Sequence, residues 1–119
     1  MSRSLLQDRS LSFAVRCVSL YKHLTTERQE YVMSKQVLRS GTSIGANIAE
    51  SRNAQSDADF ISKHSIALKE ADETHYWFEL LKLTGYLDEK EYVSLDKDLS
   101  ELIAMLTSTI KKKKINGEE

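Results

Sequence analysis

The sequence contains no proline among its 119 residues, and this absence limits the available folds more than any other feature. Proline ends or kinks helices, so a chain without it can run through long uninterrupted helices. Only four glycines are present to supply turns. Folds made of many short strands usually need more of both residues. The composition therefore favours a few long helices, and 119 residues are enough for one domain with a single core.

Apolar residues recur at three- and four-residue spacing in four segments, which is the pattern of amphipathic helices. In chain order, these segments cover residues 4–24, 26–53, 57–84 and 89–110. Short connections between successive helices make neighbouring helices antiparallel. We therefore predict an all-α fold, an antiparallel up-down-up-down four-helix bundle.

Three of the four helix starts carry a capping box, in which a Ser, Thr or Asp is followed three residues later by a polar acceptor. The pairs are Thr26 with Gln29, Ser56 with Asp59, and Asp88 with Glu91. At the other end of the chain, the lysines of residues 111–114 are expected to form a solvated cap on the last helix, because cations are favourable at a helix C-terminus; the alternative is an RNA contact. The bundle is thus predicted to span residues 1–114, with 115–119 as a short C-terminal tail.

Gly41, Gly45 and Ala49 recur every fourth residue inside the second predicted helix. A glycine inside a helix costs about 1 kcal/mol relative to alanine, so two of them require an offsetting gain. A stripe of small residues allows another helix backbone to approach closely and adds dispersion contacts. The competing interpretation is a phosphate cradle, but the lysine and the loop spacing of such a site are missing. We predict close helix packing along this stripe.

Charge is unevenly distributed, although the formal net charge is only -1. Residues 1–55 hold eight Lys or Arg against four Asp or Glu, whereas residues 56–110 hold five against twelve. Arg28, Lys35 and Arg39 fall at spacings of seven and four on the predicted second helix, opposite its apolar face. They are the candidate RNA-binding residues, since such a stripe could neutralise phosphates. The alternative is that the basic half of one subunit contacts the acidic half of the next.

Catalytic machinery is not evident in the sequence. Cys17 is the only cysteine, lies on an apolar face and so should be an inert buried thiol. A chain without an internal disulfide suits the reducing cytoplasm, where we expect this protein to act. No stretch approaches the roughly 20 apolar residues of a membrane span. We predict a protein that is not an enzyme, with no catalytic residue, cofactor, small-molecule substrate or membrane partner.

The sequence contains one partial match to a metal-binding pattern. Asp72 and His75 have the spacing of one carboxylate-histidine pair of a di-iron bundle, and Glu79 lies one turn later. Such a site needs a second pair on another helix and two further inward-facing glutamates. The other helices supply no matching histidine pair, so we predict no metal ligands.

The third predicted helix has two apolar faces. One follows the four-three spacing of a helix-packing seam, from Phe60 to Leu81. The residues away from that seam are Ile66, Tyr76, Trp77, Leu80 and Leu83. Aromatic clusters of this size are seldom left exposed to water, so we expect these residues to form an oligomer interface. The alternative is a wide core within one subunit.

The segment Ser43-Ile44-Gly45-Ala46-Asn47-Ile48-Ala49-Glu50 is similar to the motif Ser-Ile-x-x-Asn-Ile-Ala-Glu of a known bacterial family. Further matches are Phe60, Ser65-Ile66-Ala67-Leu68, Glu73 and Gly85-Tyr86-Leu87. On these residues the chain resembles the 23S rRNA-intervening-sequence protein family over most of its length. Lys69-Glu70 replaces the Gly-Ser pair of many members.

The resemblance implies a cytoplasmic four-helix bundle that assembles into a homo-oligomeric ring of five subunits and has no established enzymatic activity. A related branch comprises accessory proteins of retroelements that bind a reverse transcriptase and its RNA. The resemblance therefore also implies an alternative role, an RNA-binding accessory factor whose partner is RNA or an RNA-handling protein. Asn47, Glu50 and Glu73 are the polar motif positions. Asn47 and Glu50 are interpreted either as a polar network that fixes helix register or as a ligand site.

Overall fold

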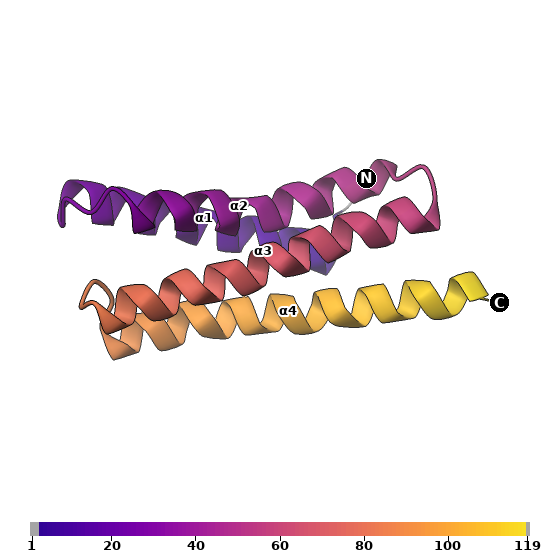
Figure 1. The fold of residues 1–119 in the computed structure, drawn as a ribbon. Helices are drawn as coiled ribbons and strands as arrows, with labels where there is room; N and C mark the ends of the chain where they lie inside the picture. Colours follow the sequence, from indigo (N-terminus) through magenta and orange to yellow (C-terminus); the bar gives the residue numbers. More distant parts are fainter. Residues whose placement is uncertain (1–2, 119) are drawn as a thin grey trace.

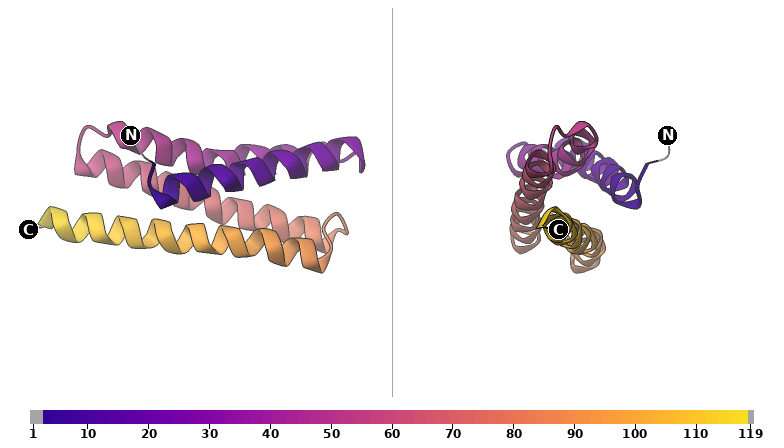
Figure 2. Two further views of the ribbon diagram at one scale, coloured as in Figure 1. Left: turned by 180° about the vertical axis from the view of Figure 1, so that it is seen from behind. Right: turned by 90° about the vertical axis from the view of Figure 1, so that its right-hand side faces the viewer.

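The computed structural model describes residues 3–118, and this part of the chain forms four long helices. They are α1 (Leu5–Thr26), α2 (Met33–Glu50), α3 (Asp57–Leu83) and α4 (Glu89–Glu118), with a short 3-10 helix, η1 (Ser51–Asn53), after α2. Successive helices run in opposite directions along a rod of 51 × 23 × 22 Å (Figure 1). Viewed along the rod, the helices occupy four corners (Figure 2). The predicted up-down-up-down bundle is confirmed.

The core lies along the rod between the four helices. Phe13 of α1 and Phe78 of α3 meet edge to face in it, with ring centroids 6.1 Å apart. The buried residues of α3 are His64, Ala67, Ala71, Thr74, Phe78 and Leu81. We call these six residues the inner seam. They match the predicted seam, except that Phe60 is only partly buried at the end of the bundle.

Close helix packing was predicted along the stripe of small residues, and the structure shows that α1 is the helix that packs against Gly41 and Gly45. A Cβ atom placed on Gly41 would overlap the Cys17 Sγ, and one placed on Gly45 would lie 3.3 Å from Ser10 Oγ. A side chain at position 41 would therefore displace Cys17, and one at position 45 would press on Ser10. Ala49 differs from this prediction, because it is exposed and lies beyond the contact.

The start of α2 corrects the sequence prediction. Thr26 ends α1 instead of capping the next helix, and its hydroxyl donates to the Lys22 carbonyl at 2.6 Å. Gln29 adopts a left-handed backbone with φ of 51°. The cap is supplied by the carboxylate of Glu30, which accepts the amides of Val32, Met33 and Ser34 at 2.7–3.0 Å. Helix α2 therefore begins seven residues later than the expected Thr26.

Burial alone would raise the pKa of Glu30, but the hydrogen bonds from these backbone amides and from the Ser34 hydroxyl outweigh it and lower the pKa. The carboxylate is thus held ionised at the positive end of α2.

The other two predicted capping sites and the C-terminal stop of α3 are present. Ser56 Oγ accepts the Asp59 amide at 3.1 Å, and Asp88 Oδ1 accepts the Glu91 amide at 2.7 Å. Gly85 has φ of 85°, which ends α3 in a left-handed turn.

The C-terminal tail is not a separate segment as far as the structure describes it. Helix α4 continues to Glu118, so the four lysines lie inside the helix instead of capping it, and residues 115–118 extend it. Lys113 pairs with Asp57 at 3.2 Å, and its ammonium group lies 4.8 Å from the centre of the Phe60 ring. These contacts to α3 hold the last turns, and no proline interrupts them. Residue 119 lies outside the described residues.

Candidate interaction surfaces

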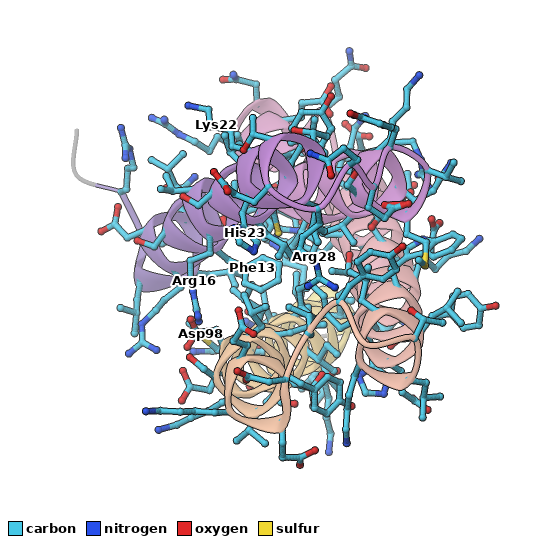
Figure 3. All side chains as sticks on the ribbon, turned by 90° about the vertical axis from the view of Figure 1, so that its left-hand side faces the viewer. Phe13, Arg16, Lys22, His23, Arg28 and Asp98 are labelled. Atoms are coloured by element: carbon cyan, nitrogen blue, oxygen red, sulfur yellow. The ribbon has the colours of Figure 1, made fainter. Side chains whose placement is uncertain are left out.

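Arg28, the first of the three candidate RNA-binding residues, lies in the α1–α2 connection and not on α2. Its guanidinium donates to the Gly85 carbonyl at 3.1 Å and lies 4.8 Å from the centre of the Tyr86 ring. Figure 3 shows this side chain among the helix ends at one end of the bundle. Arg28 therefore joins the α1–α2 connection to the α3–α4 turn.

Arg39 lies on α2, but its charge is matched by acidic groups of α3. It pairs with Glu70 at 3.3 Å and makes a close contact with Glu73. Glu73, a motif position, also accepts the indole N–H of Trp77 at 2.9 Å. Glu70 belongs to the Lys69-Glu70 pair that departs from the family pattern, so this departure adds an ion pair between α2 and α3.

Lys35, the third candidate, is exposed on α2 and makes no ion pair with any residue in the described range 3–118. The structure therefore does not bring Arg28, Lys35 and Arg39 together as one free basic surface. Sequence spacing placed them on one helix because the Glu30 cap could not be recognised from a pattern of apolar residues.

The opposite charges of the two halves of the chain meet within one protomer. Arg9 and Arg16 of α1 pair with Glu101 and Asp98 of α4, each at 2.7 Å. Arg16 also donates to the carbonyl and the hydroxyl of Ser94. Figure 3 shows Arg16 and Asp98 pointing toward one another at the α1–α4 edge, whereas Lys22 points away from the bundle. Such exposed pairs contribute only about 0–1 kcal/mol each, but they reduce the free charge of the basic half.

Asn47 and Glu50 make no hydrogen bond to another helix within the described residues. The Asn47 amide donates to the Ser43 carbonyl of its own helix at 2.9 Å, and Glu50 is exposed. A buried polar contact between α2 and α3 does exist, at Ser40 and Thr74, whose hydroxyl oxygens are 2.8 Å apart and fully buried. Ser40 could not be identified from the sequence, because a lone serine on a helix gives no signal until its partner is known.

Three side chains of types that often take part in catalysis or metal binding, Cys17, His64 and His75, are instead buried or hydrogen-bonded within the bundle. Burial raises the pKa of the Cys17 thiol to about 12, so this thiol stays protonated. Burial lowers the pKa of His64, partly offset by its hydrogen bond to the Phe60 carbonyl, and its ring stacks on Phe60. His75 lies between Asp96, at 2.6 Å, and Glu79, at 3.3 Å.

No group of three or more metal-binding side chains is found in the part of the chain that the structure describes. Helices long and apolar enough to cross a membrane are likewise absent from residues 3–118.

The predicted interface residues of α3 lie on its outer side to different degrees. Tyr76, Leu83 and Ile66 have exposed fractions of 58%, 76% and 40%. Trp77 and Leu80 are half-buried, and the Trp77 ring packs on the core while Tyr76 lies edge-on to it at 5.1 Å. The wide-core alternative thus accounts for Trp77, but Tyr76 and Leu83 remain uncovered in the single protomer.

A groove of about 320 Å³ lies between α1 and α2 on the outer surface. Its lining residues are Arg3, Gln7, Ser10, Leu11, Ala14, Thr42, Gly45, Ala46, Ala49 and Arg52. We call it the α1–α2 groove. The groove was not predicted from the sequence, although the small residues at outward positions of α2 were a signal. Because most of its lining side chains are small or apolar, the groove can accommodate apolar side chains of another molecule.

Comparison with known proteins places the chain in a family. The family model described as 23S rRNA-intervening sequence protein matches residues 4–108. A crystal structure of a protein of unknown function, from the S23 ribosomal protein family of Bacteroides thetaiotaomicron, is similar. It shares 58% sequence identity with a TM-score of 0.89, and the match covers 90% of this chain and 99% of that one. No curated protein matches significantly. The chain belongs to the 23S rRNA-intervening sequence protein family.

Proposed function

We propose that this protein is a non-enzymatic assembly module that forms a homo-oligomeric ring in the cytoplasm. The observation that carries this proposal is the outer side of α3, where Tyr76 and Leu83 expose 58% and 76% of their surface. Large apolar side chains grouped on one helix face are typical of protein interfaces. Five subunits are the number that the family resemblance implies. Cys17 is the only cysteine in the sequence, so no internal disulfide can form, which suits the reducing cytoplasm.

Light scattering on the purified protein tests the proposal. The expected mass is five times the 13.6 kDa of one chain. Tyr76→Asp combined with Leu83→Asp should shift the protein to the monomer, because two charges would enter an apolar interface. Val93→Asp is the matched control, since Val93 is 53% exposed on α4, outside the proposed interface.

Circular dichroism should show the same helical content in all three proteins. A wild-type chain that is monomeric at micromolar concentration would refute the assembly. If the α3 variant and the α4 control both keep the wild-type mass, the assembly stands but its interface lies elsewhere.

The second candidate is an RNA-binding accessory factor, for which the exposed Lys35 and the basic first half of the chain are the supporting features. Arg28 and Arg39 count against it, since both guanidinium groups are engaged within the protomer. Reversing Arg28, Lys35 and Arg39 to glutamate should weaken RNA binding and its dependence on salt if these residues contact phosphates. Lys35→Glu alone separates an RNA effect from loss of the two internal contacts.

A further inference from the structure

The outer side of α3 forms a continuous ridge with helix-packing periodicity. Positions 66, 69, 73, 76, 80 and 83 follow alternating spacings of three and four, which is the spacing that the inner seam uses for packing. We call these six positions the outer seam. Tyr76, Leu80 and Leu83 make its C-terminal half apolar, and Tyr76 and Leu83 are the most exposed of them. Tyr76 contacts the Trp77 ring edge-on and Leu80 is half-buried, but Tyr76 and Leu83 still expose 58% and 76% of their surface in the protomer.

The α1–α2 groove has the opposite shape. Its lining includes Ala14, Gly45, Ala46 and Ala49, which leave a hollow because they have no side chain beyond Cβ. A hollow of about 320 Å³ is near the lower limit of binding pockets, so it suits inserted side chains better than a whole helix. Ridges fit into grooves where helices pack. The protein thus carries a ridge and a groove on different helices.

The ridge and the groove also differ in charge: basic residues line the groove, and acidic residues flank the ridge. Arg3 and Arg52 line the groove, and Arg3 has only a distant contact to Asp8, at 3.8 Å. Asp72 and Glu79 lie on α3 beside the ridge, and both are exposed. Two ridges packed against each other would bring acidic groups together, and two grooves would leave each other unfilled. Ridge against groove pairs opposite charges and fills the hollow.

Resting on the proposed assembly, we infer that the outer seam of α3 in one copy seats its Tyr76–Leu83 half in the α1–α2 groove of the next copy. The occupant of the groove is therefore a second copy of this chain. Such a contact is heterologous, because each copy uses two different surfaces, and heterologous contacts close into rings when their rotation permits.

The groove and the Tyr76–Leu83 half of the ridge lie toward opposite ends of the rod. The groove is lined by the first half of α1 and the second half of α2, whereas Tyr76–Leu83 is the end of α3, beside the α3–α4 turn. In a closed ring with this contact, neighbouring rods are tilted against the ring axis.

Cross-linking of two variants, each with one added cysteine, tests this geometry. Tyr76→Cys and Ala46→Cys are prepared separately, unfolded, mixed and refolded, then treated with a short bis-maleimide reagent. Cys17 should not react, since it is fully buried and protonated. The mixture should give cross-linked dimers, whereas each variant alone should stay uncross-linked. Val93→Cys mixed with Ala46→Cys is the matched control and should give none.

The outcomes separate this inference from the proposed function. Cross-linking of Tyr76→Cys alone would show that two ridges meet and would overturn the inference. An oligomer that gives no cross-link in the mixture would also overturn it while leaving the assembly in place. A monomeric wild-type chain in light scattering would instead remove the proposed function itself.

A variant that fills the groove gives an independent check. Ala46→Trp places a large ring in the hollow, and because Ala46 is exposed we expect the protomer to fold normally. The mass measured by light scattering should fall to that of the monomer while the helical content is unchanged. An oligomer of unchanged mass would count against the groove as the receiving surface.

Discussion

The inner and outer seams of α3 have the same periodicity and opposite surroundings. On the inner seam, Ala67, Ala71, Thr74 and Phe78 are fully buried against the other helices of the protomer. On the outer seam, Tyr76 and Leu83 are largely exposed. The difference teaches that the spacing of apolar residues shows how many faces of a helix are apolar and need a packing partner. It does not show which face is covered within one chain.

Phe78→Ala should have the largest effect, because Phe78 is fully buried on the inner seam and packs edge-on to Phe13. The expected loss in the free energy of unfolding is about 3–5 kcal/mol, from lost burial and the cavity left behind. Urea denaturation measures it. Leu83→Ala on the outer seam is the matched control, and equal losses in the two variants would contradict the assignment of the seams.

Thr74→Val should cost less, about 1–3 kcal/mol, because it keeps the shape of the inner seam but leaves the buried Ser40 hydroxyl without its partner. Adding Ser40→Ala should recover part of this loss, since both polar groups are then removed. Urea denaturation of the two single variants and the double variant forms a complete cycle. Additive losses would mean that the two hydroxyls do not interact.

Protonation of His64, which lies on the inner seam, should make the stability of the protein depend on pH. Burial lowers the pKa of His64 in the folded protein below its ordinary value of 6.5, so the folded state binds fewer protons there than the unfolded chain. This contribution to stability is present above pH 6.5 and is lost as the pH falls below it.

Denaturation curves above and below pH 6.5 should therefore show a drop in stability that His64→Gln reduces. Glu30 acts in the same direction but at lower pH, since its lowered pKa matters only as the pH falls below its ordinary value of 4.5. Identical slopes in wild type and His64→Gln near pH 6.5 would refute this role of His64.

Leu83→Ser should have the smallest effect on the stability of the protomer, within about 0.5 kcal/mol, because 76% of the surface of Leu83 is already exposed to water. Denaturation is best followed in the Ala46→Trp background, which is expected to be monomeric and so separates folding from association. A loss of several kcal/mol there would mean that the outer seam is part of the core after all.

Helix boundaries marked by local contacts could be predicted from the sequence. Ser56 with Asp59, Asp88 with Glu91, and Gly85 all work within a few residues, so their chemistry is visible in the sequence. The start of α2 could not be recognised, because Glu30 caps it from outside the usual Ser, Thr, Asp or Asn pattern. That error also placed Arg28 on the wrong element.

Candidate surfaces could be predicted less well than helices. Arg39 was recognised as an exposed cation, but its partners Glu70 and Glu73 lie more than thirty residues away in the chain. The α1–α2 groove depends on two helices that are adjacent only in the fold. Contacts of this kind join distant parts of the sequence, so no local pattern reports them.

Residue order alone was enough to establish four long helices, their antiparallel order and the inner seam, because proline content, apolar spacing and caps act over one or two helical turns. The fold decided which charges are neutralised and which apolar residues stay exposed, since both depend on what a neighbouring helix brings within a few ångströms. Both the residue order and the fold are needed to explain the close α1–α2 contact at Gly41. The small residues permit this contact, and only the folded protein shows that Cys17 lies against it.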